Sequence, residues 1–67
     1  MDVAHRYIKT ISLDGKRIVL RELYQAVYKY NPEFKHFKGP RRFDEALRIL
    51  RQNGHIVEVE YVFRIVE

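Results

Sequence analysis

The chain of 67 residues contains no cysteine, no tryptophan and only two prolines. Without cysteine it can form neither disulfides nor thiolate zinc sites, so its fold depends on a hydrophobic core alone. No apolar run approaches the ~20 residues that span a bilayer. The N-terminal segment MDVAHRYIKT also lacks the long apolar centre of a signal peptide. We therefore expect no membrane partner and a cytoplasmic location, with nucleoid association if the chain is prokaryotic or viral.

Residues that carry catalysis are also scarce. The chain has one serine, one threonine and three histidines, and the histidines lie far apart without the paired spacing of metal ligands. Each of the three glycines is explained by a turn or a helix end, so there is no glycine-rich phosphate loop. These glycines are Gly15, Gly39 and Gly54. The sequence predicts no enzyme, no metal, no cofactor and no small-molecule substrate.

What the sequence does contain suits one small globular domain over residues 1–67. The hydrophobic fraction of 46% is too high for a disordered chain. A domain of this size buries only about 60% of its unfolded surface, which leaves no room for a deep substrate cavity. The net charge is +4, but residues 16–42 alone carry eight positive and two negative charges, a local sum of +6. Such a polarised chain attracts phosphate backbones or acidic partners.

Two segments have helical periodicity. Leu20, Leu23, Tyr24 and Val27 recur at i, i+3, i+4 and i+7 and predict a helix over residues 20–30, which Asn31-Pro32 ends. A second helix is predicted to open at Pro40 and to end at Asn53-Gly54. Its expected core stripe is Phe43, Ala46, Leu47 and Leu50. The turn between the helices is expected to tuck Phe34 and Phe37 beneath it.

Residues 3–19 allow two interpretations. Val3, Ala4, Tyr7, Ile8 and Ile11 lie on one side of a helix. Alternatively, apolar alternation before Asp14-Gly15 indicates a β-hairpin. The helical spacing is favoured, and a sharp turn at Asp14-Gly15 is common to both.

The C-terminal segment HIVEVEYVFRIVE alternates strictly between apolar and polar residues, which is typical of a β segment with one buried face. The expected buried face is Val57, Val59, Tyr61, Phe63 and Ile65. The segment is long for one strand, so a tight hairpin near residues 58–60 is an alternative. Tyr7 and Tyr24 are likewise expected on core faces.

The phrases KRIVLRELYQAVYK and GPRRFDEALRILRQNGHI carry a resemblance to winged helix-turn-helix DNA-binding domains. They are similar to small winged helices of plasmid and viral replication proteins and of stand-alone regulators. The resemblance implies an α+β winged helix, with a three-helix helix-turn-helix core, a short strand and a C-terminal β ribbon. It also implies binding of double-stranded DNA in transcription regulation or replication.

In that family the third helix enters the major groove; here this is the predicted helix that opens at Pro40. Carried onto this sequence, the groove-facing candidates are Arg41, Glu45, Arg48 and Gln52, with Arg42 at the groove edge. Arginine pairs bidentately with guanine and glutamine with adenine. Phosphate contacts are expected from Lys16, Arg17, Lys29, Lys35 and Lys38.

One departure from the family pattern supports an alternative function. The wing region carries Glu58 and Glu60 and lacks the usual basic loop. With Val62 exposed, this region fits a protein-docking module instead. A second copy of the chain, or other domains of a parent protein, are the protein partners to consider, because the terminal ribbon from Ile56 to Glu67 offers a pairing edge.

Overall fold

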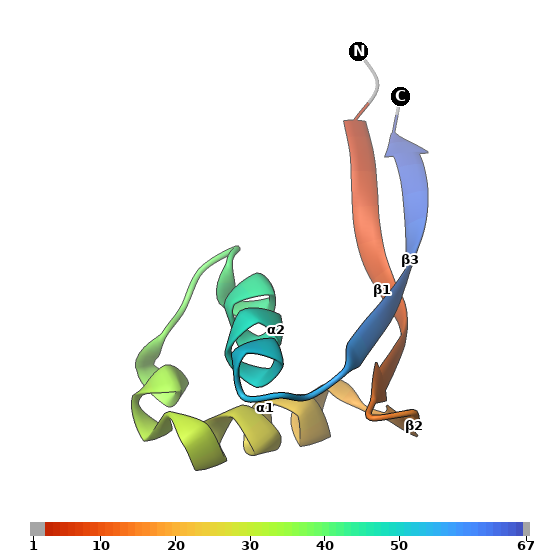
Figure 1. Ribbon diagram of the computed structural model, residues 1–67. Coiled ribbons are helices and arrows are strands. Elements are labelled where there is room, and N and C mark those ends of the chain that lie inside the picture. The colour runs from red at the N-terminus through yellow and green to blue at the C-terminus, as the bar shows by residue number, and fades with distance from the viewer. Residues whose placement is uncertain (1–2, 67) are drawn as a thin grey trace.

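The computed structural model describes the backbone of residues 3–66 and the side chains of residues 6–64. The elements are β1 (Val3–Leu13), β2 (Lys16–Ile18), α1 (Leu20–Tyr30), the 3-10 helix η1 (Pro32–His36), α2 (Arg42–Gln52) and β3 (Val57–Val66). The strands form an antiparallel sheet in the order β2-β1-β3. The helices lie beside one end of this sheet, and the remainder of β1 and β3 projects from them as a two-stranded ribbon (Figure 1).

The turn between β1 and β2 is formed by Asp14 and Gly15. Both have left-handed φ angles, 52° and 84°. They join the cross-strand partners Leu13 and Lys16. Two central residues with positive φ are the signature of the type I′ turn, whose twist matches that of paired strands. The hairpin interpretation of this segment is therefore confirmed.

A β-bulge in β1 explains why the apolar residues in residues 3–19 have helical spacing. Ile8 pairs with Tyr61 and Thr10 with Glu60, so Lys9 is an extra residue in β1. The bulge brings Ile8 and Ile11, three residues apart, to the same face of the sheet. That spacing is the one that favoured a helix. The expected helix is wrong, and with it the winged-helix fold with a three-helix core: only two α-helices occur in residues 3–66.

The C-terminal segment is a single strand and does not fold back near residues 58–60. β3 pairs with β1 from Val57 opposite Leu13 to Val66 opposite Val3. The 11-residue β1 thus provides pairing partners along the whole length of β3. A tight hairpin within the segment would instead pair only its two short halves with each other. The side chain of Ile65 lies outside the described residues.

Both predicted helices are present. α1 spans the predicted residues 20–30, and α2 begins at Arg42, two residues after Pro40, because Pro40 and Arg41 form a turn. Gly54, with a φ of 90°, provides the left-handed exit after α2. Asn31 caps η1, since its side-chain oxygen accepts a hydrogen bond from the Glu33 amide at 3.2 Å.

The core joins one face of the sheet to both helices. Leu23, Val27 and Leu50 are completely buried at its centre. The other buried members come from every layer: Ile11, Phe34, Ala46, Leu47, Ile49 and Val57. Burial of Ala46, Leu47 and Leu50 confirms the predicted stripe of α2, whose fourth member Phe43 is partly buried.

The projecting ribbon leaves two aromatic side chains outside this core. Tyr7 and Phe63 were expected to be buried, but they are 51% and 63% exposed. Phe63 is on the helix-side face, but the helices cover only the end of the sheet near Val57. Tyr7 pairs with Val62 and therefore lies on the face away from the helices. The Cα radius of gyration of 13.2 Å reflects this extension, since a compact chain of this length has about 11 Å. No helix in the described residues is long and apolar enough to cross a membrane.

Candidate nucleic-acid interface

The helix α2 presents a polar face opposite its buried stripe. Arg41 immediately precedes the helix, and Arg48 and Gln52 lie about two and three turns further along the same side; all three are exposed. Glu45 completes this face and is half-buried. Burial of Leu47 and Leu50 against the core fixes the rotation of the helix, so these outward positions follow from the apolar spacing.

Arg48 and Glu45 form an ion pair within this face. The Arg48 Nε donates to the carboxylate of Glu45 at 2.9 Å, and a second guanidinium nitrogen contacts the other oxygen. This bidentate pair lowers the pKa of Glu45 and raises that of Arg48. The pair is exposed, so it restrains the arginine only weakly. Arg48 can therefore exchange Glu45 for an anionic ligand.

Arg42 lies on a different side of α2 from the other candidates. Its guanidinium donates to the carbonyl oxygens of Phe34 (3.1 Å) and Phe37 and to the Tyr28 hydroxyl (2.8 Å). It also lies 4.5 Å from the Tyr24 ring centroid and 4.7 Å from that of Phe34. Arg42 thus links α1, η1 and α2 and directs its charge into the protein. Burial of Tyr24 in this cluster raises the pKa of its hydroxyl, although the neighbouring guanidinium opposes the shift.

The sequence contained a signal for the inward position of Arg42. It precedes Ala46 by four residues and Ile49 by seven, and both are buried. Residues at these spacings share a helix face. Arg42 therefore belongs to the edge of the core stripe.

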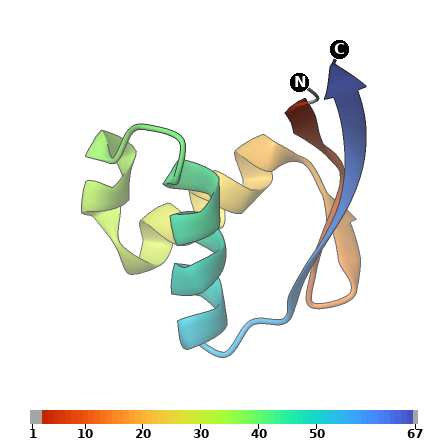
Figure 2. The same cartoon turned by 90° about the horizontal axis from the view of Figure 1, so that it is seen from above.

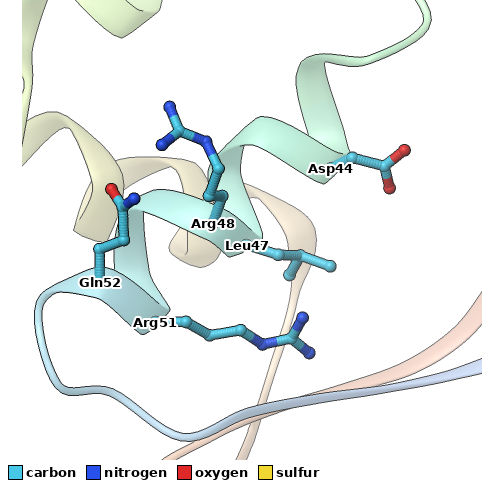
Figure 3. Close-up of a pocket in the computed structure, with 5 residues that line it drawn as sticks. All are labelled: Asp44, Leu47, Arg48, Arg51 and Gln52. Atoms are coloured by element: carbon cyan, nitrogen blue, oxygen red, sulfur yellow. The ribbon is translucent and has the colours of Figure 1, made fainter.

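A shallow depression of about 410 Å³ lies along α2 beside the outward face. It is lined by Asp44, Leu47, Arg48, Arg51 and Gln52 (Figure 3). Arg51 reaches toward β3 and donates to the Val57 carbonyl at 2.6 Å, whereas Arg48 and Gln52 point away from the ribbon (Figure 3). Asp44 is 3.5 Å from the guanidinium of Arg6 on β1. One side of the depression is thus held by internal contacts and the other is open to a ligand.

The loop before α2 supplies cations without acidic partners. Lys35, Lys38 and Arg41 are all exposed, and none forms an ion pair with a described residue. Glu33 is the only acidic residue between Asn31 and Arg41. These three cations of η1 and the following turn, together with Arg48 and Gln52 on the outward side of α2, are called the α2 face below.

The remaining predicted phosphate contacts are dispersed. Lys16 and Arg17 lie on β2, which adjoins the start of α1, whereas η1 and the loop that leads into α2 follow its end (Figure 2). Lys29 lies in the last turn of α1, near η1. All three are exposed. The structure does not bring Lys16 and Arg17 to the α2 face.

Internal contacts use most acidic groups and leave most cations available. Arg6, Lys9 and Arg48 pair with carboxylates, and Arg42 and Arg51 bond to the protein interior. Five of the thirteen cations are thus engaged, which leaves eight without such a contact in the described structure. Of the seven carboxylates with described side chains, only two, Glu33 and Glu58, have none; the others are Asp14, Glu22, Asp44, Glu45 and Glu60. The charged groups left available to a partner in the described structure are therefore mostly cations.

A second polar cluster, Asp14–His55–Tyr30, joins the hairpin turn, the segment before β3 and the end of α1. His55 Nδ1 lies 2.7 Å from the Asp14 carboxylate, and its Nε2 lies 2.5 Å from the Tyr30 hydroxyl. Asp14 also accepts from the Ile56 amide at 2.8 Å. The Ile56 amide and then His55 hold the pKa of Asp14 below its ordinary value. This cluster fixes the end of α1 and the entry to β3 against the hairpin turn. No local pattern revealed it, because Asp14 and His55 are 41 residues apart.

No group of three or more His, Asp or Glu residues in the described part of the chain is arranged to hold a metal ion. Comparisons with protein-family models, with curated proteins and with solved structures gave no match.

Proposed function

We propose that this chain binds double-stranded DNA through the α2 face. The observation that carries the proposal is a group of three cations without acidic partners in the ten residues before α2. Lys35, Lys38 and Arg41 gather before a helix whose outward side chains are Arg48 and Gln52. Cations without internal partners release condensed counterions when they meet phosphates, and this release drives binding to nucleic acid.

The α2 face contains both kinds of group that DNA recognition needs. Lys35, Lys38 and Arg41 suit phosphate contacts, which position a protein on the duplex. Arg48 and Gln52 lie further along the helix and suit base edges, since arginine reads guanine and glutamine reads adenine. An 11-residue α-helix with one exposed side also has the dimensions that the major groove admits. Such a module would act inside the cell, in transcription regulation or replication.

The salt dependence of binding tests the electrostatic part of the proposal. Three phosphate contacts predict a log–log slope of about −2.7. Affinity for a duplex would then fall about 40-fold between 50 and 200 mM salt. Fluorescence anisotropy with a labelled random duplex measures both values.

A charge-reversal pair tests the location. Arg41→Glu with Arg48→Glu should abolish duplex binding while the circular dichroism spectrum and Tm stay near those of the wild type, because both side chains are exposed. The matched control is Lys16→Glu with Arg17→Glu, which changes the net charge equally at the other end of α1. This control should retain most of the affinity, since charges beyond about 10 Å are screened at 0.1 M salt. Equal losses in the two variants would refute a localised site, and unchanged affinity in the first would refute the α2 face.

A further inference from the structure

The strand β3 has one edge paired with β1 and one edge open. In the order β2-β1-β3 it is an outer strand over its full length, Val57–Val66. Open edges are usually protected by proline, by a bulge, by short strand length or by charged side chains. The charges of β3 are of both signs (Glu58, Glu60 and Arg64), so they can pair with those of an added strand. β3 is ten residues long and contains no proline or glycine, and the described bulge lies in β1. The backbone of β3 can therefore accept another strand.

The open strand also carries exposed apolar side chains on both faces. Phe63 is 63% exposed and Val62 46% exposed, and successive residues point to opposite faces. Phe63 and Tyr61 share the helix-side face, where their ring centroids are 6.3 Å apart. Glu60, Val62 and Arg64 share the other face. A strand that covers this edge should therefore match aromatic groups on one face and charges on the other.

We infer that β3 pairs antiparallel with β3 of a second copy, about a two-fold axis at Val62. In this register Glu60 lies opposite the partner's Arg64, and Tyr61 lies opposite the partner's Phe63. Val62 meets the same residue of the partner. The sequence EYVFR is thus complementary to itself when reversed. Opposite charges and aromatic residues are favourable cross-strand pairs.

The existing contacts favour this register. Glu60 already receives Lys9 at 3.6 Å and the Thr10 hydroxyl at 3.3 Å from β1. Arg64 has no acidic partner among the described residues. The partner's Arg64 would approach Glu60 from the open side, which continues an alternation of charge across the three strands. An axis at Tyr61 would instead leave Glu60 opposite Val62.

The pairing places the two helical bodies apart. Val57 of one copy and of the other are ten residue positions apart along the paired strands, which is about 33 Å. A two-fold axis perpendicular to the sheet keeps both bodies on the same face, and the ribbons between them leave room for the helices. If the α2 face binds DNA, as proposed above, the dimer carries two such faces, and the two Val57 residues that follow them in the chain are about one helical turn of duplex apart. That consequence rests on the proposed function, whereas the pairing itself does not.

The test uses two variants that repel themselves but attract each other. Glu60→Arg places arginine opposite the partner's Arg64, and Arg64→Glu places two glutamates opposite each other. Each variant alone should dimerise at least tenfold more weakly than the wild type in sedimentation velocity without DNA. An equimolar mixture should restore dimers, because in the mixed dimer both pairs between positions 60 and 64 are again of opposite charge. Circular dichroism checks that each variant is folded.

Single cysteines give an independent reading of the register, since the chain has no other cysteine. Val62→Cys places two thiols beside the axis, at a Cα separation that suits a disulfide, and should form covalent dimers on mild oxidation. Glu58→Cys, with thiols about 26 Å apart in the same pairing, should remain monomeric. A wild type that stays monomeric at millimolar concentration would overturn the inference. Rescue by a Glu58→Arg and Arg64→Glu mixture in place of the Glu60 mixture would overturn the register.

Discussion

Arg41 and Arg42 are adjacent in sequence, but Arg41 is exposed and Arg42 bonds to the protein interior. Replacing each in turn tests which arginine stabilises the fold and which binds DNA. Arg42→Ala removes hydrogen bonds to the Phe34 and Phe37 carbonyls and to the Tyr28 hydroxyl. It also removes the cation from above two aromatic rings. Arg41→Ala removes an exposed side chain with no such contact. The two changes alter the net charge equally.

The size of the Arg42 effect follows from these contacts. A hydrogen bond from a charged group contributes about 1.5–3 kcal/mol, and a cation–π contact about 0.5–1 kcal/mol at an exposed site. One half-buried guanidinium makes all of them, so water replaces part of the loss and the contributions do not add. We expect Arg42→Ala to lower the free energy of unfolding by about 2–4 kcal/mol. A domain of this size has roughly 3–10 kcal/mol in total.

Thermal unfolding followed by circular dichroism measures the difference. For a domain this small, the Arg42→Ala loss corresponds to a fall in Tm on the order of 10–30 °C, while Arg41→Ala should melt with the wild type. Arg42→Lys keeps the charge but lacks the planar, forked donor geometry that reaches these acceptors and stacks on the rings, so its Tm should be intermediate. If Arg42→Ala has the wild-type Tm and instead loses DNA affinity, Arg42 is a surface contact and the reasoning is refuted.

Two further predictions concern carboxylates. Glu45→Gln should release Arg48 from its ion pair and strengthen duplex binding. The gain should be only roughly two- to fivefold, because an exposed ion pair holds its arginine weakly. A weaker affinity in anisotropy titrations would count against Arg48 as a ligand contact. Asp14→Asn should lower the Tm at pH 7, where the wild-type carboxylate is charged. The folded-state pKa of Asp14 is depressed, so its stabilisation is present above the unfolded pKa of about 4 and is lost as the pH falls through the folded-state value. The gap in Tm between the two proteins should therefore narrow as the pH falls below about 4, and a constant gap would contradict the role assigned to the charge.

Both α-helices could be read from local pattern because their signals are local. In α1 the apolar residues Leu23 and Val27 recur within a few residues, and Pro32 forces the end. In α2 the burial of Leu47 and Leu50 directs Arg48 to the solvent. The exposed part of the candidate site was therefore predictable. Its binding to DNA stays a prediction.

The strand β1 and the inward position of Arg42 were not predicted from local pattern. Ile8 and Ile11 share a face only because Lys9 is bulged, and the bulge exists only in pairing with β3, about 50 residues away. A three-residue apolar spacing fits a helix equally well when the partner strand is unknown. The buried neighbours of Arg42 were visible at helical spacing, but its hydrogen-bond acceptors on η1 and α1 depend on how those elements pack.

The sequence by itself determined what depends on neighbours along the chain: two amphipathic helices with their ends, the Asp14-Gly15 turn, and a basic middle third. The tertiary structure decided what depends on distant partners: that residues 3–13 pair with β3 as a strand, that the helices cover only one end of the ribbon, and that five cations are used internally. Local preferences amount to tenths of a kcal/mol per residue. Cross-strand pairing and burial of Ile11 and Val57 add over a whole interface, and so they determine the fold where local pattern is ambiguous.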